Sequence, residues 1–206
     1  MHQKNVKNAG AVLNKDSKVM IMLHGRGADE QDILSLAPLL NVKDFSLIAP
    51  VATNNTWYPF SFMAPPEKNE PWLSSAISML HNLVLDILKE GIPSINIYFL
   101  GFSQGACLTL EYVTRYAMRY GGVVAFTGGL IGDKIYMQHY SGDFMATPVF
   151  IGCSDHDPHI PVERVYATAN ILKNMNASVT EKIYVNMGHT VIQNELDTVN
   201  DLMFPI

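Results

Sequence analysis

The sequence G-F-S-Q-G at residues 101–105 contains a candidate nucleophile, Ser103. An apolar run at residues 95–100 precedes it, and a helical stretch that extends to about Arg119 follows it. A serine on a sharp strand-to-helix turn has a strained backbone that exposes its hydroxyl, and flanking glycines let the neighbouring strand and helix come close. The pattern therefore predicts a nucleophile for acyl transfer. The alternative is a tight turn whose serine only caps the helix.

A serine hydroxyl is a weak nucleophile and needs an adjacent base, which a third group orients. Where the serine lies on a strand-turn-helix motif, the acid and then the histidine follow it along the chain. The other histidines precede Ser103, lie outside strand ends or leave no room for an acid before them: His2, His24, His81, His139, His156 and His159. The segment N-M-G-H-T at residues 186–190, which contains His189, directly follows the apolar run at residues 179–185, and Gly188 permits a tight turn before the histidine. We therefore expect His189 to be the general base.

Two aspartates compete for the position of the acid. Asp155 and Asp157 both follow the apolar run at residues 148–151, which is the predicted strand before the one that leads to His189. One of them would orient the base, and the other would cap a helix or lie on the surface. The order of the residues alone leaves both assignments open.

The segment D-H-D-P-H at residues 155–159 also concentrates side chains that bind metal ions. A metal site is therefore a rival interpretation of this segment. The chain has no H-E-x-x-H or C-x-x-C pattern to support it, and adjacent loop residues rarely converge on one ion. We expect no bound metal.

Acyl transfer also needs two hydrogen-bond donors aimed at the developing oxyanion, and loss of one typically costs about two to three orders of magnitude in rate. The backbone N–H of Gln104, directly after the serine, is the first candidate. The sequence H-G-R-G-A at residues 24–28 follows another predicted strand, and its glycines let the backbone turn inward. We assign the second donor to the N–H of Arg26. The alternative is an ordinary glycine-rich loop before a helix.

The elements that must position these residues can be predicted from the apolar pattern. Six short runs predict buried strands, at residues 18–23, 46–49, 95–100, 123–126, 148–151 and 179–185. Longer amphipathic segments separate several of them. Alternating strands and helices predict an α/β protein with a mostly parallel sheet and helices on both faces. Functional residues of such sheets follow the carboxyl ends of the strands, as Ser103 and His189 do here.

Three of the predicted helices have a recognisable start or buried face. In the first, Asn69 is the expected cap, Pro71 lies in the first turn and Gly91 ends the helix. Its apolar stripe is Leu73, Ile77, Leu80, Val84 and Ile87. The second begins near Pro161, with Val162, Val165, Ala169 and Leu172 facing inward. The third carries Ile192, Leu196, Val199 and Met203 at the same spacing.

Composition excludes several classes of protein. With 206 residues, of which 48% are hydrophobic and 16% charged, the chain fits one globular domain, residues 1–206, and not a disordered protein. A formal net charge of -5 without a basic face argues against nucleic-acid binding. Cys107 and Cys153 lie in apolar stretches and are expected to be buried free thiols. No segment has the features of a secretory signal or of a bilayer span, so a cytoplasmic protein is expected.

Together these motifs resemble the phospholipase/carboxylesterase family of α/β-hydrolases, which includes acyl-protein thioesterases and small bacterial carboxylesterases. The resemblance extends from about Lys18 to the C-terminus. It rests on L-H-G-R-G-A at 23–28, W-Y-P-F-S-F at 57–62, G-F-S-Q-G at 101–105, D-P-H-I-P at 157–161 and G-H-T at 188–190. It implies the α/β-hydrolase fold and the hydrolysis of carboxylic ester or thioester bonds. The substrate would be a small-molecule ester or acyl compound, and a lysophospholipid is one example. It also implies that no cofactor takes part.

The resemblance helps to choose between the aspartates. The family usually shows a glycine, two residues, the catalytic aspartate, and a proline four residues later. Asp157 keeps the four-residue step to Pro161, whereas Asp155 keeps the three-residue step from Gly152. The chain thus departs from the pattern by two extra residues. We select Asp157, because the step into the following helix sets its position relative to His189.

The aromatic segment at residues 57–66 has two interpretations. By its position, the resemblance favours an acyl pocket lined by Trp57, Tyr58, Phe60 and Phe62. The alternative is a loop that covers the core.

Two rival functions are a dienelactone hydrolase or peptidase on the same fold, and a catalytically inactive binding relative. A dienelactone hydrolase would carry cysteine where Ser103 stands. An inactive relative would not be expected to retain Ser103, an aspartate and His189 in this order. The motifs do not encode the natural substrate, its acyl-chain length or the oligomeric state, for which a homodimer is one option.

Overall fold

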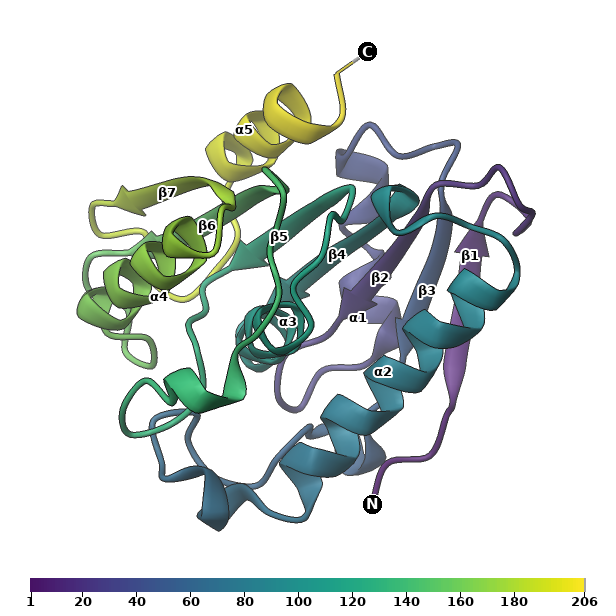
Figure 1. Ribbon diagram of the computed structural model, residues 1–206. Helices are drawn as coiled ribbons and strands as arrows, with labels where there is room; N and C mark the ends of the chain where they lie inside the picture. Colours follow the sequence, from purple (N-terminus) through teal and green to yellow (C-terminus); the bar gives the residue numbers. More distant parts are fainter. Residues whose placement is uncertain (206) are drawn as a thin grey trace.

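A central sheet organises the molecule (Figure 1), and within the described residues, 1–205, it has seven strands in the order β1-β3-β2-β4-β5-β6-β7. These coordinates are a computed structural model, and Ile206, the last residue of the expected domain 1–206, lies outside the described residues. Strand β1 pairs with β3 in the antiparallel direction, and all other pairs are parallel. The strands are β1 (Val6–Gly10), β2 (Val19–Leu23), β3 (Ser46–Pro50), β4 (Ile97–Phe102), β5 (Gly122–Phe126), β6 (Pro148–Ser154) and β7 (Ser178–Tyr184).

The six strands predicted from apolar runs are all present, with shifted ends. Residue Ile95 lies in a 3-10 turn, Ser94–Asn96, and β4 begins only at Ile97. Strand β6 continues to Ser154, because its pairing with β7 stays in register as far as Ser154 and Tyr184. Strand β1 was not predicted. It is an edge strand without a fully buried residue, so it lacks the apolar run that marks the central strands. Strand β7, at the other edge, also has no fully buried residue, which corrects the expectation of a buried strand at residues 179–185.

Helices cover both faces of the sheet, as predicted. Helices α2 (Trp72–Lys89), α3 (Gln104–Arg115) and α4 (Val162–Asn174) lie on one face, and α1 (Glu30–Leu34) and α5 (Gln193–Met203) lie on the other (Figure 1). Side chains of a strand alternate between these two layers. In β2, Ile21 packs in the core under α2, α3 and α4, whereas Met20 and Met22 pack with Ile33 of α1 and Leu196 of α5.

Most predicted helix features are found, and the others are corrected. The stripe from Leu73 to Ile87 is buried, and Gly91 has a φ of +85° beyond the end of α2. The start of α2 differs from the prediction, because the helix begins at Trp72 and Pro71 is its N-cap residue, not a residue of the first turn. Asn69 does not cap the helix, because its side-chain amide is bonded to the backbone of Phe60 and Ser61. Helix α3 ends at Arg115 and does not reach Arg119. In the other two helices Val162, Ile192 and Met203 are only half-buried, whereas Val165, Ala169, Leu172, Leu196 and Val199 are buried.

Both cysteines are buried free thiols, as expected. None of the helices in residues 1–205 is long and apolar enough to cross a membrane.

Candidate active site

Ser103 lies on the sharp turn between β4 and α3. Its φ of 55° and ψ of -118° are outside the regions that non-glycine residues usually adopt, and its N–H donates to the carbonyl of Phe126 on the neighbouring strand (3.0 Å). A side chain at Gly105 would overlap the Leu23 carbonyl of β2, and one at Gly101 would overlap the backbone of Gly105. The Ser103 side chain makes no capping bond to α3, so its hydroxyl is available for another partner.

That partner is His189, in the loop between β7 and α5. Its Nε2 lies 2.8 Å from Oγ of Ser103, and its Nδ1 lies 2.8 Å from Oδ2 of Asp157. A carboxylate can only accept a hydrogen bond, which places the proton on Nδ1 and leaves Nε2 to accept from the serine hydroxyl. Gly188, with a φ of +76°, makes the turn that brings the ring over the strand ends.

The carboxylate of Asp157 is fully buried, and both of its oxygens accept hydrogen bonds. Its side chain has 0% exposure, Oδ2 faces His189, and Oδ1 accepts the backbone N–H groups of His159 (2.8 Å) and Ile160 (2.9 Å). Three donors thus hold the carboxylate in one orientation. Of the two candidates for the acid, this is the one that contacts His189.

Asp155 has a different role in the fold. Its Oδ1 accepts the backbone N–H of Asn186 (2.8 Å) and lies 3.0 Å from Nδ1 of His156. The hydrogen bond from Asn186 is the main reason that the pKa of Asp155 lies below its usual value, and His156 adds to it. Asp155 therefore ties the turn after β6 to the loop that carries His189.

The candidate oxyanion donors come from the start of α3 and from the loop after β2. The N–H of Gln104 is at the first residue of α3, where a helix leaves its N–H groups without intrahelical partners. Arg26 follows β2, and its N–H has no hydrogen-bond acceptor among residues 1–205. Both residues line the same cavity as Ser103.

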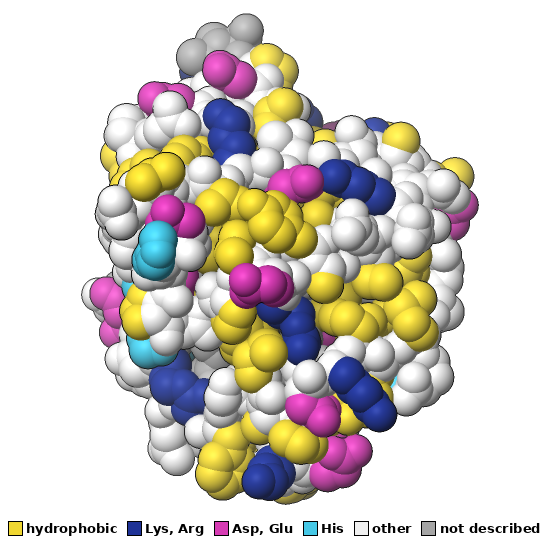
Figure 2. All heavy atoms as spheres, turned by 90° about the vertical axis from the view of Figure 1, so that its left-hand side faces the viewer, with side chains coloured by type: hydrophobic (Ala, Val, Ile, Leu, Met, Phe, Trp, Pro, Cys, Tyr) yellow, Lys and Arg dark blue, Asp and Glu magenta, His cyan; other side chains and the backbone are white. Residues whose placement is uncertain are grey.

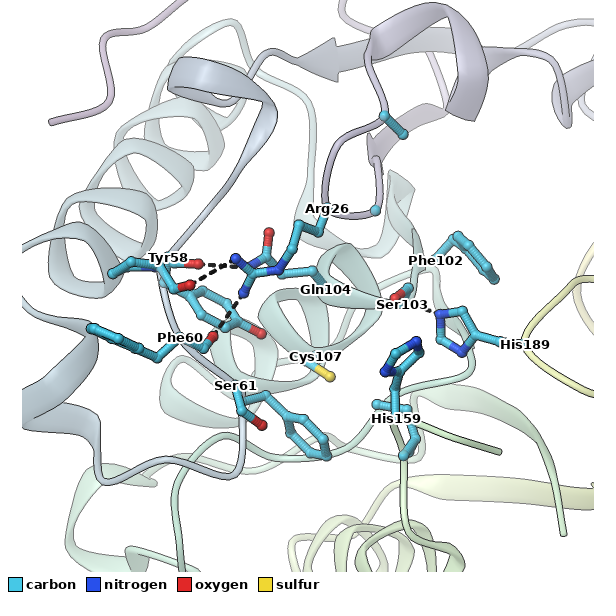
Figure 3. Close-up of a pocket in the computed structure, with 15 residues that line it drawn as sticks. Arg26, Tyr58, Phe60, Ser61, Phe102, Ser103, Gln104, Cys107, His159 and His189 are labelled. Atoms are coloured by element: carbon cyan, nitrogen blue, oxygen red, sulfur yellow. Dashed lines mark hydrogen bonds between the residues drawn. The ribbon is translucent and has the colours of Figure 1, made fainter. Parts of the chain in front are cut away.

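The side chains of these two residues hold the aromatic loop. The guanidinium of Arg26 and the amide of Gln104 bond to four consecutive residues of the loop, as the dashed lines in Figure 3 partly show. The bonds join Arg26 Nη1 to Pro59 O (2.8 Å), Arg26 Nη2 to Phe60 O (2.7 Å), Gln104 Nε2 to Tyr58 O (2.8 Å), and Trp57 N to Gln104 Oε1 (2.9 Å). The loop and the candidate oxyanion donors therefore form one connected unit.

A cavity of about 440 Å³ opens in front of Ser103 (Figure 3). Three of the four predicted aromatic residues line it: Tyr58, Phe60 and Phe62. Trp57 does not, which corrects the expectation. It is fully buried behind the loop, where its indole N–H donates to the carbonyl of His24 (2.8 Å).

The cavity also contains residues that were not singled out as ligand contacts: Phe102, Cys107, His159 and Ile160. Cys107 could have been found by spacing, because it lies one helical turn after Ser103 on the same face of α3. Burial raises the pKa of its thiol to about 12, so it forms part of the apolar wall and is not a second nucleophile. No aspartate or glutamate of the described residues lines this cavity.

No group of three or more His, Cys, Asp or Glu side chains within residues 1–205 is arranged so that it could hold a metal ion. In the segment at 155–159, the carboxylate of Asp157 is turned toward His189, and that of Asp155 toward Asn186.

Glu195 is a buried titratable group next to the site, in the first turn of α5. Its Oε2 accepts the N–H of Ile192 (3.0 Å), whereas Oε1 is buried and has no hydrogen-bond partner in the described part of the chain. Burial raises the pKa of this carboxyl group to about 7, against the effect of the Ile192 bond. The carboxyl group packs against Gly152 of β6. It thus lies where α5, the helix that follows His189, meets β6, the strand that leads to Asp157.

Known proteins resemble this chain over almost its whole length. Residues 10–203 match the family model described as Phospholipase/Carboxylesterase. The crystal structure of a phospholipase/carboxylesterase from Dyadobacter fermentans is 47% identical, with a TM-score of 0.96 over 99% of this chain and 98% of that one.

More distant relatives are carboxylesterases and thioesterases by name. Acyl-protein thioesterase 1 of Gibberella zeae is 31% identical over 121 residues, which are 58% of this chain and about half, 52%, of the relative. A probable carboxylesterase of Arabidopsis thaliana, SOBER1-like, is 24% identical over 95% of this chain and 82% of its own length.

Proposed function

The chain belongs to the phospholipase/carboxylesterase family of α/β-hydrolases, and from this we propose that it hydrolyses carboxylic esters with Ser103, His189 and Asp157 as its catalytic triad. The observation that carries the proposal is the continuous hydrogen-bond path from Ser103 Oγ to His189 Nε2, and from His189 Nδ1 to Asp157 Oδ2, at 2.8 Å for each step. These are the distances at which a general base can take the proton of a nucleophile.

In the acylation step, Ser103 Oγ forms a bond to the carbonyl carbon of the ester while His189 Nε2 takes the hydroxyl proton. Asp157 stabilises the imidazolium that results. The carbonyl oxygen becomes an oxyanion, which the backbone N–H groups of Arg26 and Gln104 stabilise. The bond to the alcohol oxygen then breaks, and His189 gives its proton to the departing alcohol.

Deacylation repeats these steps with water. His189 takes a proton from a water molecule, whose oxygen attacks the acyl carbon. The tetrahedral intermediate collapses, the bond to Ser103 Oγ breaks and the proton returns to the serine. The products are an acid and an alcohol, and no metal or cofactor is needed in this sequence of steps.

We place the acyl group against the apolar part of the cavity, formed by Phe60, Phe62, Cys107 and Ile160. An oxygen ester is the first choice. A thioester is the alternative, because three relatives are named acyl-protein thioesterase 1. A lysophospholipid is a third acyl donor of the same kind. The value of kcat/KM for a series of p-nitrophenyl esters of increasing acyl length shows which length of acyl chain this part of the cavity accommodates.

A fluorophosphonate probe tests the proposal directly, because it reacts with activated serines. The wild-type protein should be labelled at Ser103 and should hydrolyse p-nitrophenyl acetate, and Ser103→Ala should lose both properties. Labelling that survives in Ser103→Ala would place the nucleophile elsewhere. A wild-type protein that is neither labelled nor active would support a binding protein instead of an enzyme.

A further inference from the structure

His159 lies beside the base. Its ring and that of His189 meet edge to face, with 4.8 Å between their centroids (Figure 3). The backbone of His159 is held by Asp157, whose Oδ1 accepts its N–H at 2.8 Å. The side chain is exposed and lines the cavity, and neither ring nitrogen has a hydrogen-bond partner within residues 1–205. A fixed backbone thus presents an unengaged imidazole next to the reacting atoms.

His159 lies on the side of the cavity where the alcohol part of the ester must bind. His189 must return its proton to the alcohol oxygen, so this oxygen has to lie near His189 Nε2. His159 is on this side of Ser103, whereas Arg26 and Gln104 lie on the opposite side, toward Tyr58 (Figure 3). The side chains of Arg26 and Gln104 are also occupied by the aromatic loop. His159 is therefore the side chain best placed to contact a polar substituent of the alcohol.

The charges around His159 favour an anion. The cavity has no carboxylate lining among the described residues. The nearest one, Asp157, has 0% side-chain exposure and is covered by its bond to His189. Asp155 and His156, in the same segment, are paired with each other outside the cavity. The groups that can carry positive charge at the cavity are His159, His189 and Arg26.

We propose that His159 binds an anionic substituent, a carboxylate or a phosphate, on the alcohol part of the ester. The enzyme would therefore prefer esters whose alcohol part carries such an anionic group. The inference rests on the proposed esterase function. His159 is then a specificity residue that donates a charge-assisted hydrogen bond, and the chemistry at Ser103 does not depend on it.

The test compares two acetyl esters that differ in one charge, 3-acetoxybenzoate and its methyl ester. The quantity measured is the ratio of kcat/KM for the anionic ester to kcat/KM for the neutral ester. His159→Gln should lower this ratio about tenfold, as expected for loss of one charge-assisted hydrogen bond. A second pair, acetylglycerol phosphate and monoacetylglycerol, tests phosphate in the same way.

A further variant separates charge from shape. His159→Lys should retain the preference for the anionic ester, because a lysine ammonium group is positively charged although its side chain differs in shape from an imidazole. His156→Gln is the matched control, since His156 is exposed and outside the cavity, and its ratio should equal that of the wild type.

A His159-dependent preference in either pair of esters supports the inference and identifies the anion. The same ratio in wild type and His159→Gln for both pairs overturns it, as does an equal loss of activity toward the anionic and neutral esters. The proposed function fails in a different way: Ser103→Ala would then hydrolyse the neutral ester as fast as the wild type.

Discussion

Asp155 accepts a hydrogen bond of 2.8 Å from the backbone N–H of Asn186, so the aspartate that does not contact His189 still holds the loop that carries it. Both aspartates follow β6, and the two residues between them decide their roles. Asp155 comes directly after the last residue of β6, next to the end of β7, where its carboxylate meets the β7–α5 loop. Asp157 extends beyond the strand ends and reaches the ring of His189.

We expect Asp157→Asn to lower kcat about ten-thousand-fold in a protein that still folds, because an amide cannot stabilise the imidazolium and favours the wrong tautomer of His189. Asp155→Asn should retain most of the activity and unfold at a slightly lower urea concentration, because it weakens the acceptor of one hydrogen bond to the loop. Steady-state kinetics and urea denaturation of both variants check this. The reverse result, an inactive Asp155→Asn beside an active Asp157→Asn, would assign the acid to Asp155.

The site residues that could be predicted from the sequence are those whose position depends on a local pattern. Ser103 follows the buried strand β4 and His189 follows the half-buried edge strand β7, each at a glycine-containing turn, and local backbone geometry places them at the same edge of the sheet. The acid was harder to choose, because the choice depends on where β6 ends. Its last pairs are made with β7, about thirty residues further along the chain, and no local signal marks that end.

The remaining errors have the same origin. Trp57 and Tyr58 are adjacent aromatic residues of one loop, yet only Tyr58 lines the cavity. The difference comes from the bond between the Trp57 indole and His24, 33 residues earlier. Asn69 has the residue type of a helix cap, but its amide is bonded to Phe60, nine residues earlier. Such contacts override local propensity and cannot be seen in a single sequence.

The second prediction concerns metal ions. The steps proposed for ester hydrolysis use only side-chain and backbone groups, so prolonged dialysis against EDTA should leave kcat/KM for p-nitrophenyl acetate unchanged. The control is re-addition of zinc or manganese to the dialysed protein, which should have no effect. Activity that disappears on dialysis and returns with metal would revive a metal site at residues 155–159.

The third prediction concerns the bonds between Arg26 and the aromatic loop. Arg26→Leu removes the donors to Pro59 and Phe60 and releases the loop from the segment that carries a candidate oxyanion donor. We expect kcat to fall about tenfold or more, because a displaced oxyanion donor acts on the transition state, with a stability loss of only about 1 kcal/mol. The measurement is kcat and KM of both proteins with p-nitrophenyl esters of short and of long acyl chains.

Lys15→Leu is the matched control for Arg26→Leu, because Lys15 is exposed and does not line the cavity. It should retain wild-type kinetics. An Arg26→Leu variant with unchanged kcat for all acyl lengths would show that the loop does not position the donor.

The last prediction follows from the buried carboxyl group of Glu195. Its pKa in the folded protein is raised to about 7 from an ordinary value of 4.5, so the folded state keeps a proton that the unfolded state has lost. The stabilisation is therefore fully present below about pH 4.5 and is lost as the pH rises to about 7. A difference of about 2.5 pKa units, at about 1.4 kcal/mol per unit, sets the full change at about 3 kcal/mol.

Glu195→Gln should remove this dependence, because an amide of the same shape can still accept from Ile192 and does not ionise. Relative to the wild type, the variant should therefore gain unfolding free energy between about pH 4.5 and pH 8, by up to about 3 kcal/mol. Urea denaturation at both pH values gives this difference, and other titrating groups contribute equally to the two proteins. Glu163→Gln is the control, because Glu163 is exposed in the first turn of α4 and its substitution should leave the pH dependence unchanged. Parallel curves for wild type and Glu195→Gln would mean that Glu195 ionises in the folded protein as readily as in the unfolded chain.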